Sequence, residues 1–478
     1  MDQTTPDTAP RAASSGRREH GFTEDAVRVL VPTGMLGSGF PAETLSRGID
    51  LGADVIAVDG GSTDSGPHYL GTATAKTARG AVARDLRVIL TAARSADVPV
   101  IVGSCGTSGT DKGVDWVYDI VADIAGVEGL DLVVARVYSE QHSEHVIAML
   151  AEGRVRPLPP AGWLQPETVA RCSHIVGLMG HEPIADALNG GANVVLAGRA
   201  SDTAVIAAVP LLRGLPPGPV WHAAKTTECG GLCTDSPRSG GVLVTIDAGG
   251  FTVEPLAPEA ACTPSSVAAH MMYENADPFR MREPAGTLDT SAATYRALDA
   301  RRVRVEGSRF DLAEQHTIKL EGSAPTGYQT MIVVGIRDPA VLARLDEWCD
   351  LVLEALHQRV PGTLGLARDD YDLRIIRYGH DAVLGALEPD RDQPPREVGV
   401  VFLATAPDQG TATQLAKLAN PLLLHAPLPD ASSLPSYAFL SSPAETERGQ
   451  QHEFVLQHAV DVDKPGELFR TTFDRAAA

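Results

Sequence analysis

The segment Val55-Ile-Ala-Val-Asp59-Gly-Gly-Ser-Thr-Asp64-Ser65-Gly66 is a short apolar run that ends on an acid and continues into a polar loop containing glycine. A continuous run of β-branched and apolar residues is typical of a strand buried on both faces of a parallel sheet. Ligands of such sheets bind outside the carboxyl ends of the strands. The segment therefore predicts a parallel sheet, with a carboxylate placed where that sheet binds its ligand.

The same pattern recurs along the first half of the chain. Further apolar runs that lead into polar loops lie at 28–31, 98–102, 132–137, 174–179 and 194–197. Segments of helical composition separate them, and strands that alternate with helices are typical of βαβ units. We therefore predict an α/β domain over residues 26–235, with a mostly parallel, doubly wound sheet and glycine-rich loops at its strand ends.

The second half of the chain has a different pattern. After Leu215-Pro-Pro-Gly-Pro219, several apolar runs alternate with polar residues, which indicates strands that face water on one side. Helices are expected at 340–358 and 410–420. We predict an α+β domain over residues 236–478 with a mixed or antiparallel sheet. Residues 1–25 are rich in Thr, Pro, Ser and charge, and we expect a disordered tail there.

The composition excludes several classes of partner. The chain has 478 residues and a formal net charge of −21, which argues against nucleic acid or an anionic membrane, since both bind basic surfaces. No apolar stretch reaches the roughly 18 uninterrupted residues of a membrane span. Six cysteines in so long a chain are too few for a disulfide scaffold, and no signal-peptide pattern is present. We expect a cytoplasmic protein.

Four acids at or just after predicted strand ends are the catalytic candidates: Asp59, Glu140, Asp202 and Glu228. Crowded carboxylates raise one another's pKa and suit general acid–base work, or they hold a cation. We expect Asp59 or Glu140 to be the general base, and Asp202 or Glu228 to be its acid partner. The alternative for each single acid is that it caps the helix that follows.

Loop residues around these acids are the candidates for substrate binding. The loops at 34–39 and 104–109 are expected to supply N–H groups that stabilise an anion. Arg199 and Lys225 are expected to pair with an anionic group of the substrate. The full set is Gly37, Ser38, Gly60, Gly61, Ser62, Asp64, Ser104, Cys105, Gly106, Ser108, Tyr138, Arg199, Ser201, Thr203 and Lys225.

Two cysteine-containing segments leave alternatives open. Cys105 follows a predicted strand and is either a nucleophile near backbone N–H groups or, as the commoner case, a small buried apolar residue. Cys229 and Cys233 lie near His222 in the sequence, which allows a structural zinc. No second pair of cysteines at metal spacing accompanies them. We assign neither a metal site nor a cofactor.

One feature suggests a nucleotide. The segment Asp59-Gly-Gly-Ser-Thr is similar to the first phosphate loop of the actin and sugar-kinase ATPases. A β-hairpin follows in those proteins, whereas a helical segment follows here. The glycine loop at 34–39 is neither the dinucleotide fingerprint nor a P-loop with its Lys-Ser/Thr ending. A nucleotide-dependent phosphotransferase is therefore kept as the third hypothesis for the function of this chain.

Taken together, these loops resemble the acyclic terpene utilisation (AtuA) family, from about Val27 almost to the C-terminus. The matching segments are Gly34-Met-Leu-Gly-Ser-Gly-Phe, Asp54 to Gly66, Gly103 to Gly109, Tyr138-Ser-Glu140, Gly198 to Thr203, His222 to Gly231, and Glu321-Gly-Ser with Gly327-Tyr328-Gln and Gly335-Ile-Arg-Asp-Pro339. Members often carry a C-terminal ferredoxin-fold module. We do not expect that module in this chain, so the resemblance implies a separate small ferredoxin-fold subunit or none.

The AtuA family is associated with bacterial degradation of citronellol and geraniol. The resemblance implies an enzyme of branched-chain or terpenoid acyl-CoA or carboxylate metabolism, with a small acidic or acyl-CoA substrate. A lyase, hydratase or isomerase reaction is favoured over redox chemistry because the dinucleotide fingerprint is lacking. The alternative is a non-catalytic ligand-binding subunit that needs a ferredoxin-fold partner. We also expect a homo-oligomer.

Overall fold

The computed structural model describes residues 26–431, 435 and 437–477, which divide into two compact units. Unit 1 takes the described residues of Met1–Ala170, His174–Gly322 and Val455–Ala478, and unit 2 takes those of Arg171–Ser173 and Ser323–Phe454. The tail expected at residues 1–25 lies outside the described residues. Two long strands, β15 (Thr317–Ile336) and β19 (Thr446–Asp461), run from one unit into the other.

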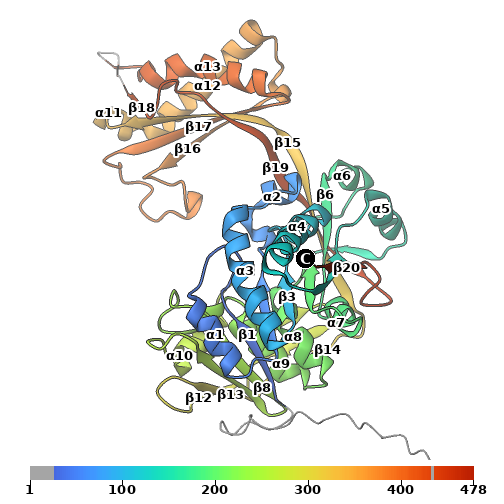
Figure 1. Ribbon diagram of the computed structural model, residues 1–478. Helices are drawn as coiled ribbons and strands as arrows, with labels where there is room; N and C mark the ends of the chain where they lie inside the picture. Colours follow the sequence, from blue (N-terminus) through green and yellow to red (C-terminus); the bar gives the residue numbers. More distant parts are fainter. Residues whose placement is uncertain (1–25, 432–434, 436, 478) are drawn as a thin grey trace, which may run out of the picture. The chain divides into compact units, whose positions relative to one another are not determined.

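Unit 1 is built on a sheet whose centre is parallel (Figure 1). Its strands are Val27–Val31 (β1), Val55–Asp59 (β2), Val100–Gly103 (β3), Leu132–Tyr138 (β4), Val194–Ala197 (β7), Val242–Asp247 (β8), Gly250–Pro255 (β9), Thr294–Ala297 (β12), Val303–Glu306 (β13) and Arg470–Ala476 (β20). Their order is β12-β13-β9-β8-β1-β2-β3-β7-β4-β20. Neighbours from β1 to β4 pair in parallel, and the flanking strands pair antiparallel.

Helices cover both faces of this sheet, which confirms the predicted doubly wound arrangement. They are Ala42–Asp50 (α1), Arg79–Ala96 (α3), Asp111–Glu128 (α4), Glu182–Asn189 (α7), Asp202–Leu212 (α8) and Pro217–Thr227 (α9). Leu86 of α3 and Ile120 of α4 belong to the apolar core on one face. Ile206 of α8 and Trp221 of α9 belong to the core on the other. The apolar stripes of these helices explain why the strands between them are apolar throughout.

Shorter elements complete unit 1. The helices are Thr63–Ser65 (η1), Pro67–Thr72 (α2), Ser143–Ala151 (α5), Pro166–Arg171 (α6, which ends in unit 2), Gly230–Cys233 (η2) and Pro264–His270 (α10). The strands are Val155–Pro157 (β5), His174–Leu178 (β6), Arg280–Glu283 (β10), Gly286–Asp289 (β11) and Arg309–Leu312 (β14). Strands β10, β11 and β14 form a small antiparallel sheet. Strand β6, expected beside the other first-half strands, pairs instead with β15.

The end of the parallel region does not coincide with the end of unit 1. Strand β8 pairs antiparallel with β1 along its length, from Val27 with Ile246 to Val31 with Val242, and β9 and β13 extend the sheet further. The boundary expected at residue 235 therefore falls inside unit 1, because the alternating strands after it use the open edge of β1. Unit 1 continues to Gly322.

Unit 2 has one layer of antiparallel strands covered by helices on one face (Figure 1). Its elements are Pro339–Leu342 (α11), Leu345–Leu364 (α12), Arg368–Asp370 (η3), Asp372–Tyr378 (β16), Gly385–Leu387 (η4), Val398–Ala406 (β17), Gln409–His425 (α13) and Ala438–Phe439 (β18). Strand β17 pairs antiparallel with β16 and β15, and its residues alternate between buried and partly exposed. The predicted α+β class with antiparallel strands is confirmed.

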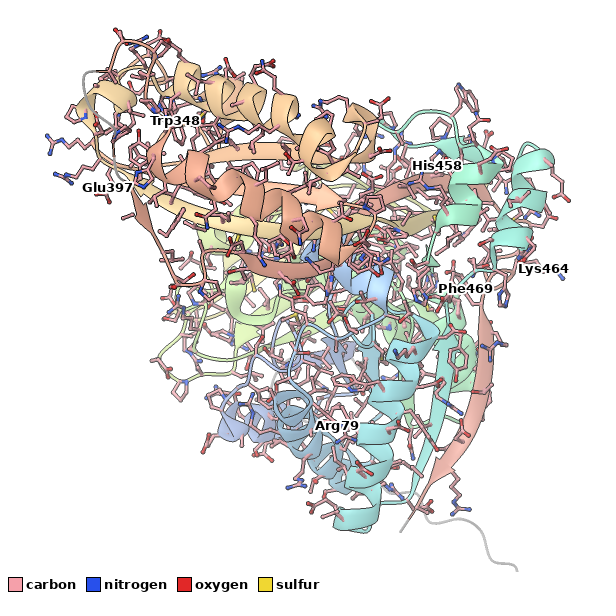
Figure 2. The ribbon with its side chains drawn as sticks, turned by 90° about the horizontal axis from the view of Figure 1, so that it is seen from above. Arg79, Trp348, Glu397, His458, Lys464 and Phe469 are labelled. Carbon is pink, nitrogen blue, oxygen red and sulfur yellow. The ribbon has the colours of Figure 1, made fainter. Side chains whose placement is uncertain are left out.

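The core of unit 2 forms around α12 and α13. Trp348 of α12 is fully buried, and its Nε1 donates a hydrogen bond to the carbonyl of Ala426 at 2.9 Å (Figure 2). Phe402 of β17 belongs to the same apolar cluster. In the described part of the chain, every helix is too short or too polar to span a bilayer.

Candidate functional site

The loops chosen from the sequence share one edge of the unit 1 sheet. Because the central strands are parallel, their carboxyl ends point the same way. Asp59 pairs with Gly103 across β2 and β3, and Val137 pairs with Ala197 across β4 and β7. The acid that ends β2 and the Gly198-Arg199 turn after β7 therefore lie at the same edge, with β3 between their two strands.

Asp59 is a buried carboxylate with one free oxygen. Its Oδ2 accepts a hydrogen bond from the Gly61 N–H at 3.0 Å, while its Oδ1 is buried without a hydrogen-bond partner among the described residues. Burial raises the pKa of Asp59 well above its usual range, and the nearby charge of Asp202 raises it further. Arg199 and the amides of Gly61 and Gly60 oppose that rise only in part. Asp59 thus holds a proton more readily than an ordinary aspartate does.

Gly60 and Gly61 allow two loops to touch. A Cβ on Gly60 would lie 2.6 Å from the Gly103 carbonyl oxygen, and one on Gly61 would lie 2.5 Å from the Thr107 Cα. The φ of Gly61 is +142°, which a residue with a side chain rarely adopts. The glycines after Asp59 therefore bring the loops after β2 and β3 together, a packing role beside the binding role expected from the sequence.

Arg199 forms a buried ion pair that the sequence did not predict. Its Nε donates to Glu321 Oε2 at 2.9 Å, and its Nη1 donates to the Ser104 hydroxyl at 3.2 Å. Arg199 and Glu321 are 7% and 3% exposed. Ser139 holds the Arg199 backbone, because its hydroxyl accepts the Arg199 N–H at 2.6 Å. Arg199 is therefore fixed by the protein itself, rather than free to pair with a substrate anion as expected.

Glu321 is the centre of a network of donors. The Lys319 ammonium lies 2.7 Å from its Oε1, and the Thr63 hydroxyl donates to its Oε2 at 3.0 Å. Burial alone would raise the pKa of Glu321, but Arg199 and Lys319 outweigh that effect and hold the pKa at about 2. Glu321 is therefore a permanent anion at neutral pH, which keeps Arg199 in place.

Asp202, the first residue of α8, lies on the other side of Arg199. Its Oδ1 is 3.7 Å from Arg199 Nη1 and, like Asp59 Oδ1, is buried with no hydrogen bond to any described residue. Burial raises the pKa of Asp202, although Arg199 and Lys225 lower it. Two carboxylates with raised pKa values thus lie around one guanidinium group.

The two residues that flank Asp202 bind a further acid. The hydroxyls of Ser201 and Thr203 donate to Glu283 at 2.9 Å and 2.6 Å. Burial raises the pKa of Glu283 to about 7, although the hydrogen bonds from these hydroxyls lower it. Ser201 and Thr203, predicted to bind substrate, are therefore engaged with Glu283, which was not among the predicted residues.

Lys225 and Glu228 form a pair at the end of α9. The Lys225 Nζ donates to Glu228 Oε1, and both side chains are buried. Burial raises the pKa of Glu228 to about 8, against the lowering effect of Lys225, and Asp202 adds to the rise. Lys225 is thus neutralised within the protein rather than left free for a substrate anion. The charge of Asp202 reaches both Glu228 and Asp59, so these acids belong to one cluster.

Glu140 has partners of its own. It accepts the Asp111 N–H at 3.0 Å and contacts His174 Nδ1 through its other oxygen. Tyr138, two residues earlier, donates its hydroxyl to Asp115 at 2.7 Å, and the Arg470 guanidinium lies 4.1 Å from its ring centroid. The structure thus gives both residues contacts separate from those of Asp59 and Asp202.

The whole loop after β3 is buried, including Cys105 and Ser108. Cys105 has no exposed surface, lies in an apolar core and donates its thiol to the Val102 carbonyl at 3.7 Å. Burial raises the pKa of its thiol, so the thiolate is disfavoured. Ser108, also fully buried, donates its hydroxyl to the Tyr69 carbonyl at 3.2 Å. Of the two alternatives for Cys105, the structure gives the buried apolar residue. Gly106, with a φ of +69°, would place a Cβ 2.5 Å from the Gly113 Cα.

The loop at 34–39 uses its amides internally. The N–H groups of Gly37 and Gly39 donate to one oxygen of Asp85 at 2.8 Å and 3.0 Å. Asp85 is 2% exposed, so these loop amides already have a buried side-chain acceptor within the protein. Ser38 is exposed. In the next loop, the Ser62 hydroxyl caps η1 by accepting the Asp64 N–H at 3.2 Å, which is a local turn contact.

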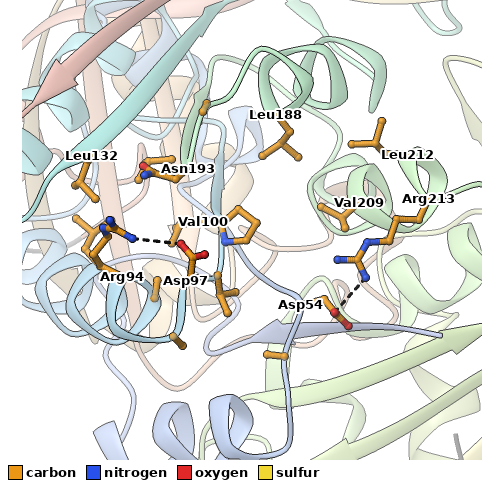
Figure 3. A pocket seen from close by; sticks show the side chains of 18 residues that line it. Asp54, Arg94, Asp97, Val100, Leu132, Leu188, Asn193, Val209, Leu212 and Arg213 are labelled. Atoms are coloured by element: carbon orange, nitrogen blue, oxygen red, sulfur yellow. Dashed lines mark hydrogen bonds and ion pairs between the residues drawn. The ribbon is translucent and has the colours of Figure 1, made fainter. Parts of the chain in front are cut away.

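A separate cavity lies at the opposite ends of the strands. It has a volume of about 520 Å³ and includes Val100 at the start of β3 and Val194 at the start of β7 (Figure 3). Arg213 pairs with Asp54 at 3.1 Å, so these charges in its lining are neutralised within the cavity. The acids predicted from the sequence do not line it.

Sequence reasoning missed Glu283, Glu321 and Asp85. Glu321 occurs in one of the segments that resemble the AtuA family, and it follows a predicted strand, but 122 residues separate it from Arg199. Asp85 lies within a helix and Glu283 at the end of a short polar strand. Only the spatial arrangement identifies these three acids.

The fold and the acid cluster define a doubly wound α/β protein with a polar site at the carboxyl edge of its parallel strands. The sequence profile described as "Acyclic terpene utilisation family protein AtuA" matches residues 75–212 and 239–436, more than half of the chain. The chain therefore belongs to the AtuA family. Neither the curated proteins nor the solved structures gave a significant match. The matched residues include Arg199, Asp202 and Glu321, whereas Asp59 precedes them.

Proposed function

We propose that this protein is an enzyme that uses Asp59 and Asp202 as a general acid–base pair. The observation that carries the proposal is the pair of carboxylate oxygens, Asp59 Oδ1 and Asp202 Oδ1, that are buried without hydrogen-bond partners in the described part of the chain. A buried polar atom without a partner costs stability, so each one calls for an explanation, such as bound water, an ion, or a role in binding or catalysis.

The electrostatics of the pair support proton transfer. An ideal catalytic base has a pKa near the working pH. Burial and the charge of Asp202 raise the pKa of Asp59, and Arg199 limits the rise. Two interacting carboxylates lose their protons in separate steps, so one is ionised while the other still carries its proton. Because the charge of Asp202 raises the pKa of Asp59, Asp59 keeps its proton and would donate it to substrate, and the ionised Asp202 would accept a proton elsewhere on it.

Arg199 acts in this proposal as a positioning residue. Its guanidinium is held by Glu321 at 2.9 Å and lies 3.7 Å from Asp202 Oδ1. A cation fixed at that distance keeps the ionised form accessible at neutral pH despite burial. The buried pair with Glu321 thus explains why two acids in an apolar setting remain able to exchange protons.

The substrate class comes from the family. The AtuA description names acyclic terpene utilisation, which supports a terpenoid or branched-chain carboxylate or its acyl-CoA. Removal and return of a proton next to a carbonyl is the step shared by lyases, hydratases and isomerases that act on such compounds. That shared step is why we propose this reaction class.

The test is exchange of substrate hydrogen with solvent. The protein is incubated in D₂O with a panel of branched-chain and terpenoid acids and their acyl-CoA esters, and deuterium uptake is followed by mass spectrometry. Wild type is expected to catalyse uptake with at least one compound, and Asp59→Asn and Asp202→Asn are expected to lose it while remaining folded. Asp123→Asn, on the exposed face of α4, is the matched control.

The outcomes separate the alternatives. Unchanged exchange in Asp59→Asn would contradict the proposal. Saturable binding of one of these compounds with no exchange would indicate a ligand-binding subunit, and co-purification of a small ferredoxin-fold protein would support that reading. A thermal shift that only nucleotides cause would indicate a phosphotransferase.

A further inference from the structure

Three side chains of unit 1, one of them Glu228 of the acid cluster, bring metal-ligating atoms together. One atom each from Glu228, Cys229 and His270 lie within 4.8 Å of one another. They are a carboxylate oxygen, a thiol sulfur and an imidazole nitrogen. Glu228 and His270 are 6% and 5% exposed, and Cys229 is partly exposed. The group is therefore mostly shielded from water but can be reached through Cys229.

His270 has an unused nitrogen. Its Nε2 is buried and has no hydrogen-bond partner within the described residues. A buried imidazole nitrogen with no partner loses the hydrogen bond that water would give it. Metal-bound histidine regains that loss, because the nitrogen lone pair becomes a ligand. This orphaned nitrogen is independent of the geometry of the other two residues and points to a ligand.

The fold fixes His270 relative to Cys229. Helix α10 ends at His270, and Ser266, four residues earlier, lies on the same face of the helix. The Ser266 hydroxyl donates to the Cys233 carbonyl at 2.8 Å, which ties α10 to η2, the turn directly after Cys229. A capping box between Thr263 and Ser266 fixes the start of the helix. The face of α10 that carries His270 is thus held against the segment that carries Cys229.

The backbone of Cys229 is held equally firmly. A Cβ on Gly34 would lie 2.9 Å from the Cys229 carbonyl oxygen, so only glycine fits at that position. Gly230, with a φ of +59°, would place a Cβ 3.0 Å from the Gly34 amide nitrogen. The loop at 34–39 and the turn at 229–230 therefore pack backbone to backbone, which fixes the direction of the Cys229 side chain.

The zinc arrangement that the sequence allowed is not formed. Both ring nitrogens of His222 have partners: Nδ1 contacts the Ser308 hydroxyl at 2.6 Å, and Nε2 contacts the Tyr295 hydroxyl at 3.1 Å. Cys233 is fully buried and donates its thiol to the Gly230 carbonyl at 3.5 Å. Cys229 lies instead with Glu228 and His270, which were not considered together in the sequence.

We propose that Glu228, Cys229 and His270 bind a zinc ion through three protein ligands. Sulfur, nitrogen and oxygen together are the donors that Zn²⁺ takes in proteins, and magnesium or calcium would require oxygen alone. Three protein ligands leave a fourth tetrahedral position open, which is the arrangement of zinc sites that bind water or substrate. The Lys225 ammonium contacts one oxygen of Glu228, and we assign the metal to the other oxygen.

The site is proposed independently of the acid–base pair, because zinc content can be measured without substrate. The experiment strips the full-length protein with a chelator and titrates it with zinc against a chromophoric competitor. Bound zinc is then counted by elemental analysis. Wild type is expected to bind one zinc per chain. Cys229→Ser and His270→Gln are each expected to weaken binding more than about tenfold, since even loss of an outer-sphere partner costs that much.

Cys233→Ser is the matched control, since its thiol is buried four residues from Cys229, outside the group of three, and it is expected to keep the zinc. X-ray absorption of the zinc-loaded wild type covers the case in which a variant fails to fold. One sulfur and otherwise nitrogen or oxygen neighbours are expected. Three results would overturn the proposal. They are wild type that binds no stoichiometric zinc, a zinc with two sulfur neighbours, and Cys229→Ser and His270→Gln variants that bind zinc as tightly as wild type. A failure to exchange substrate hydrogen with solvent, with zinc still bound, would contradict only the acid–base proposal and not the zinc site.

Discussion

Arg199 Nε lies 2.9 Å from Glu321 Oε2, and the two side chains are among the most buried charges in unit 1. The pair joins the turn after β7 to strand β15. Removing one partner of a buried ion pair leaves the other charge in an apolar setting without compensation. The contact therefore connects the stability of unit 1 to the geometry of the candidate site.

Replacing Glu321 with glutamine tests that connection. Glu321→Gln removes the anion that Arg199 and Lys319 share and leaves Arg199 with Asp202 at 3.7 Å, so we expect the free energy of unfolding to fall by about 3 kcal/mol or more. Denaturant unfolding at neutral pH measures it. Asp123→Asn removes the partner of Arg79 (labelled in Figure 2) in an exposed ion pair and should change stability little. Equal effects of the two variants would contradict a structural role for the buried pair.

Asp59→Asn should separate stability from activity. The buried carboxylate has a raised pKa, so its charge is unfavourable in the folded protein, and a neutral amide of the same shape removes that cost. The asparagine oxygen can still accept the Gly61 N–H. We expect an unchanged or higher Tm, together with a loss of turnover of about 10²- to 10⁴-fold, the range for general acid–base catalysis. A clear drop in Tm would assign Asp59 a structural role.

Glu283 predicts a specific dependence of stability on pH. Its pKa rises from 4.5 to about 7 in the folded protein. The folded state therefore binds a proton that the unfolded state releases, and stability falls as pH rises from about 4.5 to about 7, with no further change above. The fall amounts to roughly 3 kcal/mol, at 1.36 kcal/mol for each pKa unit.

Glu283→Gln removes this group from the pH profile. The difference in unfolding free energy between wild type and the variant should change between pH 4.5 and pH 7 and stay constant above about pH 7.5. The contribution of Glu321 to stability depends on pH in the opposite direction, because its pKa is held at about 2 in the folded protein. Its contribution is complete above the unfolded pKa and is lost as pH falls through about 2, so it does not interfere. A difference that is flat across the whole range would show that Glu283 is ionised in the folded protein.

Asp85 should prove essential for the loop at 34–39. Asp85→Ala leaves the N–H groups of Gly37 and Gly39 without their acceptor, and hydrogen bonds to a charged group contribute about 1.5–3 kcal/mol each. We expect a lower Tm and faster hydrogen exchange of the two glycine amides, measured by NMR or mass spectrometry. Ser38→Ala, at an exposed position in the same loop, is the control. Unchanged amide protection in Asp85→Ala would mean that another group holds the loop.

The sequence predicted the parts of the fold that depend on local pattern. The apolar run from Val55 to Asp59 correctly gave a buried parallel strand ending on an acid, because burial on both faces needs that composition. Strand β20, Arg470–Ala476, has no such pattern: it lies at the sheet edge, antiparallel to β4, and most of its residues are exposed or partly exposed. Its place depends on an open edge far away in the sequence.

The partners of the site residues were beyond prediction for a similar reason. Arg199 was expected to bind a substrate anion because an isolated arginine in a loop after a strand is free to do so. Glu321 removes that freedom from 122 residues away, and Asp85 does the same for the amides of Gly37 and Gly39 from within a helix. Long-range pairing of charges leaves no local pattern, so the loop residues could be selected from the sequence but the acids that pair with them could not.

The interpretation of Cys105 as a buried core residue can be tested by chemical modification. Its thiol has no exposed surface, so a reagent cannot reach it, and burial raises its pKa, so little of it is the reactive thiolate. We expect an alkylating reagent at neutral pH to leave Cys105 unmodified in the native protein and to modify it fully after unfolding, as read by peptide mass spectrometry. Cys105→Ala should retain turnover and cost about 1 kcal/mol, the price of a small cavity. Rapid native modification of Cys105 with loss of turnover would instead make it a nucleophile.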